Sequence, residues 1–312
     1  MLNLIWNENM KIYRRLRSWL LVVSMIVITA VALLIVQNMT SSQTGSDWKV
    51  SVQQKIDQDN SRLGADIPSA HKEELQKDLR LNQYRLDHNV PPTDKTLWGN
   101  VLTGAHLLTI VTIFTVIVAA DSVAGEFSSG TIKLLLIRPV SRSKVLLAKY
   151  VSTIGFSLFL FLILFASAVI VSGLLVGFQD AGTPYLYAAQ DGGIHEVGMM
   201  YHALSTYGYQ SVQLILIVTM AFMISTVFRS SSLSIAISIG IMFVGSAIAN
   251  FITSYPWAKY YLFENTDLTV YLDGAPKIEG MTLSFSITVL VVHYLFFIAS
   301  SWLVFNRRDV AS

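Results

Sequence analysis

Few side chains in this sequence could do acid–base chemistry inside its long apolar runs. His106 and His293 are the only ionisable residues within those runs. An ionisable group at membrane depth is a candidate for a proton relay or a substrate contact. For His293 the favoured alternative is a neutral ring that hydrogen-bonds a neighbouring helix, because a neutral ring costs less to bury than a charge. His106 lies near the end of its run, where a structural role is favoured more strongly.

The sequence offers little support for metal binding, thiol chemistry or nucleotide binding. The sequence has no cysteine, which excludes disulfides, thiolate metal sites and a cysteine nucleophile. No metal site is predicted, because the scattered His and acidic residues of one polar stretch lack tight ligand spacing and are interpreted as solvated loop residues: Asp180, Asp191, His195, Glu196 and His202. No G-x-x-x-x-G-K-[ST] phosphate loop occurs. We therefore expect a non-catalytic chain without a cofactor, with any ATP and Mg²⁺ bound by a partner.

Composition points to the membrane. Hydrophobic residues make up 53% of the chain and charged residues 13%, whereas soluble domains carry about 25% charged residues. Six apolar runs are long enough to cross about 30 Å of hydrocarbon. The sequence predicts an all-α polytopic membrane protein, one transmembrane domain over residues 1–312, with spans at Trp19–Val36, Leu102–Ala120, Val151–Phe178, Val212–Phe228, Leu233–Ile252 and Met281–Phe305. The fourth and fifth spans should form a tight hairpin.

The charges of the loops predict the orientation. The segments on the side of both termini hold 12 Lys and Arg against 4 acids, and the other loops hold 10 against 16. Because basic residues favour the cytoplasmic side, both termini are predicted to be cytoplasmic in a multi-pass plasma-membrane protein. A cleaved signal peptide is a weaker alternative, since the first apolar run continues to Val36, past its candidate cleavage site.

Two outer loops have recognisable patterns. Residues 37–101 form a predicted extracytoplasmic insertion with helices near Asp47–Arg62 and Ser69–His88. This insertion is interpreted as a small helical hairpin, with substrate gating as the alternative. The loop Thr253–Gly280 is rich in aromatic residues, and anchoring at the bilayer interface is favoured over stacking on a substrate.

The predicted cytoplasmic segment 121–150 contains a short amphipathic helix over Thr131–Ile137. Gly125 and Gly130 would permit sharp turns, Ser128 or Ser129 would cap this helix, Pro139 would end it and Ser141 would cap the next one. Its apolar face is Ile132, Leu135 and Leu136, with Lys133 and Arg138 at the polar margins. This pattern fits a plug for a partner's groove or a helix on the membrane surface.

The same segment resembles a known signature. Gly125-Glu126-Phe127, Gly130-Thr131-Ile132-Lys133, Leu135-Leu136 and Arg138-Pro139-Val140-Ser141-Arg142 are similar to the motif of ABC-2 type permeases, the membrane subunits of bacterial ABC exporters. The ending Phe305–Val310, the six spans and the long first outer loop also resemble that family, although the loop exceeds that of smaller members. The resemblance implies a coupling helix seated in a separate ATPase, with Glu126 facing that ATPase and docking residues Glu126, Ile132, Lys133, Leu135, Leu136, Arg138 and Arg142.

The resemblance also implies partners: two ABC ATPase subunits, and a second copy of this chain or a related permease. Membrane lipid is a further partner, and no nucleic acid is expected. Small residues four apart support close helix packing: Gly173 and Gly177, Ala236 and Gly240, and Gly245 and Ala249. The expected substrate is an amphipathic peptide, antibiotic or lipid. The alternatives are an ion-coupled secondary carrier, disfavoured because the spans lack carboxylates, and a non-transporting sensor of extracellular peptides.

Overall fold

The protein is a helical membrane protein, and the part of the chain that the structure describes has six helices long and apolar enough to span a bilayer. The computed structural model describes residues 1–41, 48–64, 69–94, 96–132, 140–178, 182–188, 193–272, 276, 278 and 280–307. The spanning helices are α2 (Leu16–Ser41), α6 (Leu108–Ser128), α8 (Arg142–Val176), α9 (Met199–Val227), α10 (Ser231–Ile252) and α11 (Leu283–Arg307). The predicted number of spans is confirmed. The 35 residues of α8 extend over about 52 Å at about 1.5 Å per residue, so this helix continues well beyond the hydrocarbon.

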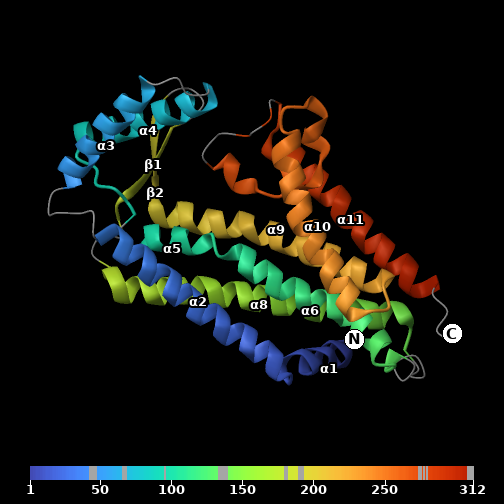
Figure 1. Cartoon of the computed structure of the whole chain (residues 1–312). Coiled ribbons are helices and arrows are strands. Elements are labelled where there is room, and N and C mark those ends of the chain that lie inside the picture. Colours follow the sequence, from blue (N-terminus) through green and yellow to red (C-terminus); the bar gives the residue numbers. More distant parts are fainter. Residues whose placement is uncertain are drawn as a thin grey trace.

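Helices α6, α8 and α9 run side by side through the middle of the molecule, and α2 lies along α8 (Figure 1). Their facing sides are apolar and fully buried at Val111, Leu160, Leu164 and Leu214. Helices α10 and α11 cross this group obliquely and separate from it toward the end that carries α3 and α4 (Figure 1). The tight turn predicted between the fourth and fifth spans is present at residues 228–230, where Ser230 caps α10.

The second predicted span is interrupted, which the sequence analysis did not anticipate. A short helix α5 (Leu97–Ala105) ends at His106, and α6 begins at Leu108. Tyr207 of α9 donates a hydrogen bond of 3.0 Å to the carbonyl of Val101 beside this break. A Cβ atom at Gly104 would lie 3.0 Å from Ala168 of α8. Close packing of α5 on α8 and α9 therefore accompanies the interruption.

The insertion between the first two predicted spans folds, as predicted, into two helices that lie against each other, α3 (Trp48–Leu63) and α4 (Ser69–His88) (Figure 1). Below them lies a small hairpin of strands β1 (Pro184–Ala188) and β2 (Ile194–Gly198), paired from Pro184 opposite Gly198 to Ala188 opposite Ile194. The structure is therefore not purely helical, and His195 and Glu196 lie on a strand. His202 is buried, with its ring 3.8 Å from that of Tyr185. Its interpretation as a solvated loop residue is wrong.

The aromatic loop is built from short 3-10 helices η1 (Pro256–Tyr260), η2 (Leu262–Glu264) and η3 (Leu268–Tyr271). Tyr255, Trp257 and Tyr260 are exposed, an arrangement typical of interfacial anchors. Tyr261 instead donates to the carbonyl of Gly245, and Tyr271 bonds Ser286. The aromatic residues thus divide into an outward set and a set that fixes the loop to α10 and α11.

The opposite end of the bundle gathers both termini, the end of α6, the start of α8 and the turn between α9 and α10 (Figure 1). An additional helix there, α1 (Leu2–Tyr13), was not predicted. It packs on α8, where the ring of Tyr13 lies 5.7 Å from that of Phe156 and Ser152 donates to the carbonyl of Ile5. We call this end of the molecule the terminal end.

Candidate coupling site at the terminal end

A group of four charged residues, three of them buried, joins α1, α6 and α8 at the terminal end. The ammonium of Lys149 lies 2.9 Å from Glu8 Oε2, 2.5 Å from Glu126 Oε1 and 3.1 Å from the carbonyl oxygen of Ser122. Its side chain is 2% exposed. A buried ammonium requires close carboxylates to offset its lost hydration. Lys149 therefore lies inside the protein and not on its aqueous surface.

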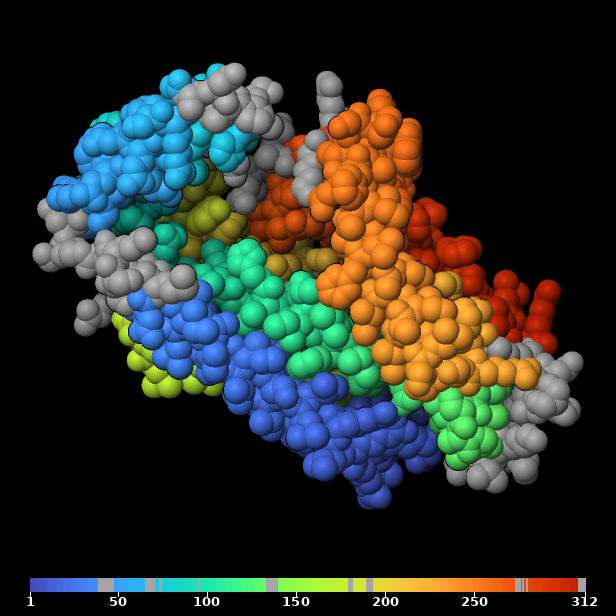
Figure 2. All heavy atoms as spheres, in the orientation of Figure 1, coloured from blue at the N-terminus to red at the C-terminus, as the bar shows by residue number. Residues whose placement is uncertain are grey.

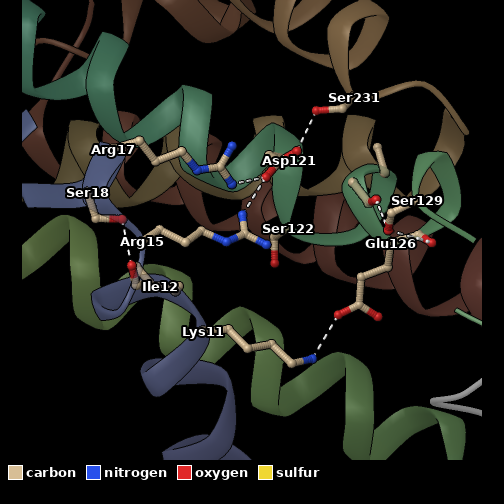
Figure 3. Close-up of polar contacts among 12 residues, drawn as sticks. Lys11, Ile12, Arg15, Arg17, Ser18, Asp121, Ser122, Glu126, Ser129 and Ser231 are labelled. Carbon is tan, nitrogen blue, oxygen red and sulfur yellow. Dashed lines mark hydrogen bonds and ion pairs between the residues drawn. The ribbon is translucent and has the colours of Figure 1, made fainter. Parts of the chain in front are cut away.

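Lys11 completes the group, with its ammonium 2.7 Å from Glu8 Oε1. The same ammonium lies 2.9 Å from Glu126 Oε1, a contact drawn in Figure 3. Burial alone would raise the pKa of Glu8, but attraction by Lys149 and hydrogen bonds from Lys11 and Lys149 lower the pKa below its ordinary value of 4.5. Burial opposes the charge of Lys11 as well, yet its hydrogen bonds to Glu8 and Glu126 raise the pKa of Lys11. The shifts of Glu8 and Lys11 therefore both favour the charged forms at neutral pH.

A second cluster lies one turn earlier on α6, around Asp121. Arg15 Nη1 lies 2.9 Å from Asp121 Oδ2, Arg17 pairs with the same oxygen, and Ser231 of α10 donates to Oδ1 at 2.5 Å (Figure 3). Asp121 is therefore paired with two basic residues near the start of α2. A Cβ atom at Gly125 would lie 2.5 Å from Asp121 Oδ1. Gly125 lies inside helix α6, where the lack of a side chain makes room for this carboxylate, and not in the sharp turn predicted for it. Gly130, with φ +72°, lies in a turn as predicted.

Hydroxyl groups join the end of α6 to α9 and α10. Ser225 Oγ of α9 accepts from the backbone N–H groups of Val123 and Ala124, each at 3.0 Å, and donates to the carbonyl of Ala120 at 2.7 Å. Ser128 Oγ accepts from Ser231 N at 3.0 Å. The last turns of α6 are thus hydrogen-bonded to the α9–α10 hairpin.

The start of α8 is held by the last turns of α11. Trp302 Nε1 donates to Ser143 Oγ at 3.0 Å, Ser143 donates to Asn306 Oδ1 at 3.3 Å, and Arg142 donates to the carbonyl of Asn306 at 3.4 Å. Residues 129–141 connect α6 to α8. Both ends of this connecting segment are consequently fixed to the bundle, one through α1, α9 and α10 and the other through α11.

The predicted docking residues occupy different environments. Lys133, Leu135, Leu136 and Arg138 lie outside the described residues. Ile132 is 4% exposed and packs in a cluster with Val123, Leu146, Phe222 and Phe305. Glu126 is buried, and the described residues offer its Oε2 atom no hydrogen-bond partner. The side chains of Ile132 and Glu126 thus face the interior of this chain rather than a partner, and only Arg142, half-buried, lies at the edge of the segment.

The serines predicted to cap helices also have roles different from the predicted ones. Ser128 belongs to α6 itself, and Ser129 is the residue after its last turn, with its hydroxyl donating back to the carbonyl of Gly125 at 2.8 Å. Ser141 does precede α8, although its side chain makes no capping bond. The predicted helix at 131–137 lies outside the described residues except for Thr131 and Ile132.

The small residues predicted to pack helices have separate roles within the chain. Gly177 ends α8 with φ +77°, and a Cβ at Gly173 would lie 2.9 Å from Phe178. Gly245 makes room for the ring of Phe263, which a Cβ would meet at 2.2 Å. Ala249 is buried, whereas Ala236 is exposed and a Cβ at Gly240 would meet no atom within 4 Å. Among the described residues, neither the exposed Ala236 nor the open position of Gly240 indicates close packing against another helix.

His293 forms a hydrogen bond with the carbonyl of Val289 in its own helix, 2.8 Å away, rather than with a neighbouring helix.

The sequence did not reveal that Lys149, Lys11 and Glu8 form one site. The available signal was the presence of a lysine and a glutamate at the very edge of apolar segments, where a charge is costly unless it is paired.

Together, the spanning helices and the charged terminal end define a multi-pass helical membrane protein. The chain matches DUF2705, a family of proteins of unknown function, over residues 83–311, and it belongs to that family. It is 39% identical over 321 residues to the uncharacterized protein YhcI of Bacillus subtilis, an alignment that covers 100% of both chains. It is 29% identical over 221 residues to the uncharacterized membrane protein YdbK of the same organism, covering 70% of this chain and 85% of YdbK.

Proposed function

We propose that this protein is the permease subunit of an ABC-2 type exporter in the plasma membrane, with both termini in the cytoplasm. A separate ATPase, present in two copies, would bind and hydrolyse ATP with Mg²⁺. A second copy of this chain or a related permease would complete the path for an amphipathic substrate. This chain itself would be non-catalytic.

One observation carries the proposal. The segment 129–141, which holds most of the motif that resembles the permease signature, is fixed at both ends to the bundle by the buried charges of Glu126 and Lys149 and by the contacts of Ser143 with α11. A segment that transmits force must not slide relative to the helices that it moves. Buried ion pairs and interhelical hydrogen bonds provide such a fixed attachment.

The geometry also supports a route for the motion. A displacement of segment 129–141 would act on α6 and α8 directly, on α1 through Lys11 and Glu8, and on α9 and α10 through Ser225 and Ser231. Packed helices move as rigid bodies rather than deforming continuously. We expect closure of two ATPases to tilt these helices together and to change the side on which the path opens.

The proposal is tested at Leu135 and Leu136, which are predicted from the sequence to contact the ATPase. We expect Leu135→Asp combined with Leu136→Asp to leave membrane insertion intact and to abolish co-purification of the tagged chain with an ABC ATPase from its native membrane. Charged groups in an apolar docking face remain unpaired and desolvated, which opposes association. Val50→Asp provides the matched control, because Val50 is exposed on α3 at the opposite end.

Co-purification unchanged by the double substitution would contradict docking at this segment. Absence of an ATPase from the wild-type preparation, with transport that survives depletion of ATP, would favour an ion-coupled carrier instead. Loss of co-purification in both the double variant and the Val50→Asp control would point to a general folding defect and would count against the specific site.

A further inference from the structure

A cavity of about 630 Å³ lies near the outer part of the bundle, away from the charged terminal end. Its walls come from α5, α6, α9, α10 and the loop of 3-10 helices. Figure 2 shows the surface hollowed between α5 and α10, with α9 deeper in the hollow. The volume lies within the range of sites that enclose small organic ligands, about 300–1,000 Å³. The site is therefore large enough for a ligand of several rings.

One part of the cavity wall is apolar, with Met242, Phe243 and Phe263 among its residues. The break between α5 and α6 borders this space, because Ala105, His106 and Leu108 line the cavity. Aromatic and thioether side chains adapt to apolar groups of different shapes. This part of the wall can pack against the apolar part of a ligand, and it does not select strongly for the shape of that ligand.

A second part of the wall is polar but uncharged, formed by Thr112, Thr206, Gln210 and Gln213. Gln210 Oε1 is buried and has no hydrogen-bond partner among the described residues. A rotation of this amide toward the cavity would break no bond made by that oxygen. The wall can thus supply hydrogen bonds to a ligand at low cost.

Within the described part of the chain, the ionisable residues that line the cavity include two carboxylates and two histidines, His106 and His202. Asp94 and Asp267 line it, whereas the described lining contains no Lys or Arg. Both aspartates are exposed at the mouth. Asp267 is held in place by Thr269, whose backbone N–H donates to Oδ1 at 3.0 Å. Arg85 acts electrostatically on Asp94 but does not line the cavity.

We infer that this cavity binds a lipophilic organic cation, whose apolar body packs against Met242, Phe243 and Phe263 and whose positive charge lies near Asp94 and Asp267. An acidic mouth over an apolar chamber attracts cations and repels anions of the same size. The inference rests on the proposed function in one respect, because the ligand would be the exporter's substrate. Binding itself requires only this chain.

The test uses two probes of the same shape and opposite charge, tetraphenylphosphonium and tetraphenylborate. Binding is measured by calorimetry on the full chain in zwitterionic nanodiscs at pH 8, where ordinary histidines are neutral, with empty nanodiscs subtracted. We expect saturable binding of the cation and at least about tenfold weaker binding of the anion.

Three variants assign the effect to the cavity. Asp94→Asn with Asp267→Asn should weaken cation binding by about tenfold or more, because both nearby carboxylate charges are removed. Ser246→Phe, which fills the chamber from α10, should weaken binding of the cation while both aspartates remain. The matched control is Asp57→Asn with Asp87→Asn on α3 and α4, two exposed carboxylates outside the cavity, and we expect it to bind like the wild type.

Equal affinity for the two probes, no saturable binding of either, or a control as weak as the cavity variants would overturn the inference. So would cation binding unchanged in both cavity variants. The outcome is separable from the proposed function: an ATPase that co-purifies through Leu135 and Leu136 without cation binding would leave the exporter with a different substrate. Cation binding without an ATPase would leave the cavity as the site of another kind of transporter or sensor.

Discussion

Lys149 is the residue on which the terminal end most depends. Its ammonium contacts Glu8 and Glu126, which come from two other helices, and it is almost completely buried. No interval in the sequence indicates a contact between residues 141 positions apart, so this pair could not be predicted. A contact of Asp121 with an arginine could be predicted in part. Three arginines precede the first span, and the predicted topology places them on the same side of the membrane as Asp121.

Removal of the Lys149 charge should be strongly destabilising. We expect Lys149→Met to lower the free energy of unfolding by about 3–5 kcal/mol, because two buried carboxylates, Glu8 and Glu126, both lose a contacting cation. The measurement is unfolding by SDS in mixed micelles. Lys144→Met is the control, since Lys144 is exposed on the same helix. If Lys149→Met loses no more unfolding free energy than Lys144→Met, other groups must neutralise the charges of the two carboxylates.

The attachment of α1 should depend on pH in both directions. The pKa of Glu8 is lowered, so its stabilising contribution is present above the ordinary value of 4.5 and is lost as the pH falls through the lowered value. The pKa of Lys11 is raised, so its contribution is present below the ordinary value of 10.5 and is lost as the pH rises through the raised value. The attachment should thus be strongest between these limits.

Thermal unfolding of wild type and Glu8→Gln tests this dependence. We expect the difference between their melting temperatures to be largest near pH 7 and to shrink toward pH 3. The substitution Asp57→Asn, at an exposed carboxylate of α3, should show no such trend. A difference for Glu8→Gln that stays constant from pH 7 to pH 3 would mean that the Glu8 charge does not stabilise the native state.

At the scale of elements, the sequence predicted those features that depend on length and apolar composition. The six spans and the hairpin of α3 and α4 follow from such local signals. The break between α5 and α6, the strands β1 and β2 and the amphipathic helix α1 were missed. The break accompanies packing of Gly104 against α8 and α9, which apolar composition does not reveal. Helix α1 is stabilised by α8, because its polar face buries Glu8 only in that context.

The contact between α6 and α9 can be tested at Ser225. Its hydroxyl serves the backbone of three α6 residues, so Ser225→Ala should leave two buried N–H groups without this acceptor and cost about 1–3 kcal/mol of unfolding free energy. Ser238→Ala is the matched control, because Ser238 is equally buried but donates only to Ser234 in its own helix. The same unfolding measurement applies, and equal losses for the two serines would contradict a special role for the α6 contact.

At the scale of the whole molecule, the fold separates the charges of the loops. The segments of the terminal end carry a net charge of +8, and the remaining loops carry −6. The structure brings the first set together at one end and places α3, α4 and the strands at the other (Figure 1). Two basic residues of the terminal end, Lys11 and Arg15, form ion pairs with Glu126 and Asp121. Part of the positive charge is therefore neutralised within the protein. The remaining basic residues still favour that end for the cytoplasm.

Cysteine labelling decides the orientation, and the chain is suited to it because it has no native cysteine. We expect Asp57→Cys, at an exposed position of α3, to react with a membrane-impermeant maleimide in intact cells. Thr131→Cys, exposed at the terminal end, should react only after the cells are lysed. Each variant is the control for the other, because both thiols are accessible on the protein and differ only in the side of the membrane. The reverse pattern would place segment 129–141 outside the cell, where no ATPase could reach it. Labelling of both positions in intact cells, with a cytosolic marker still protected, would mean that the chain does not adopt the single orientation that force transmission requires.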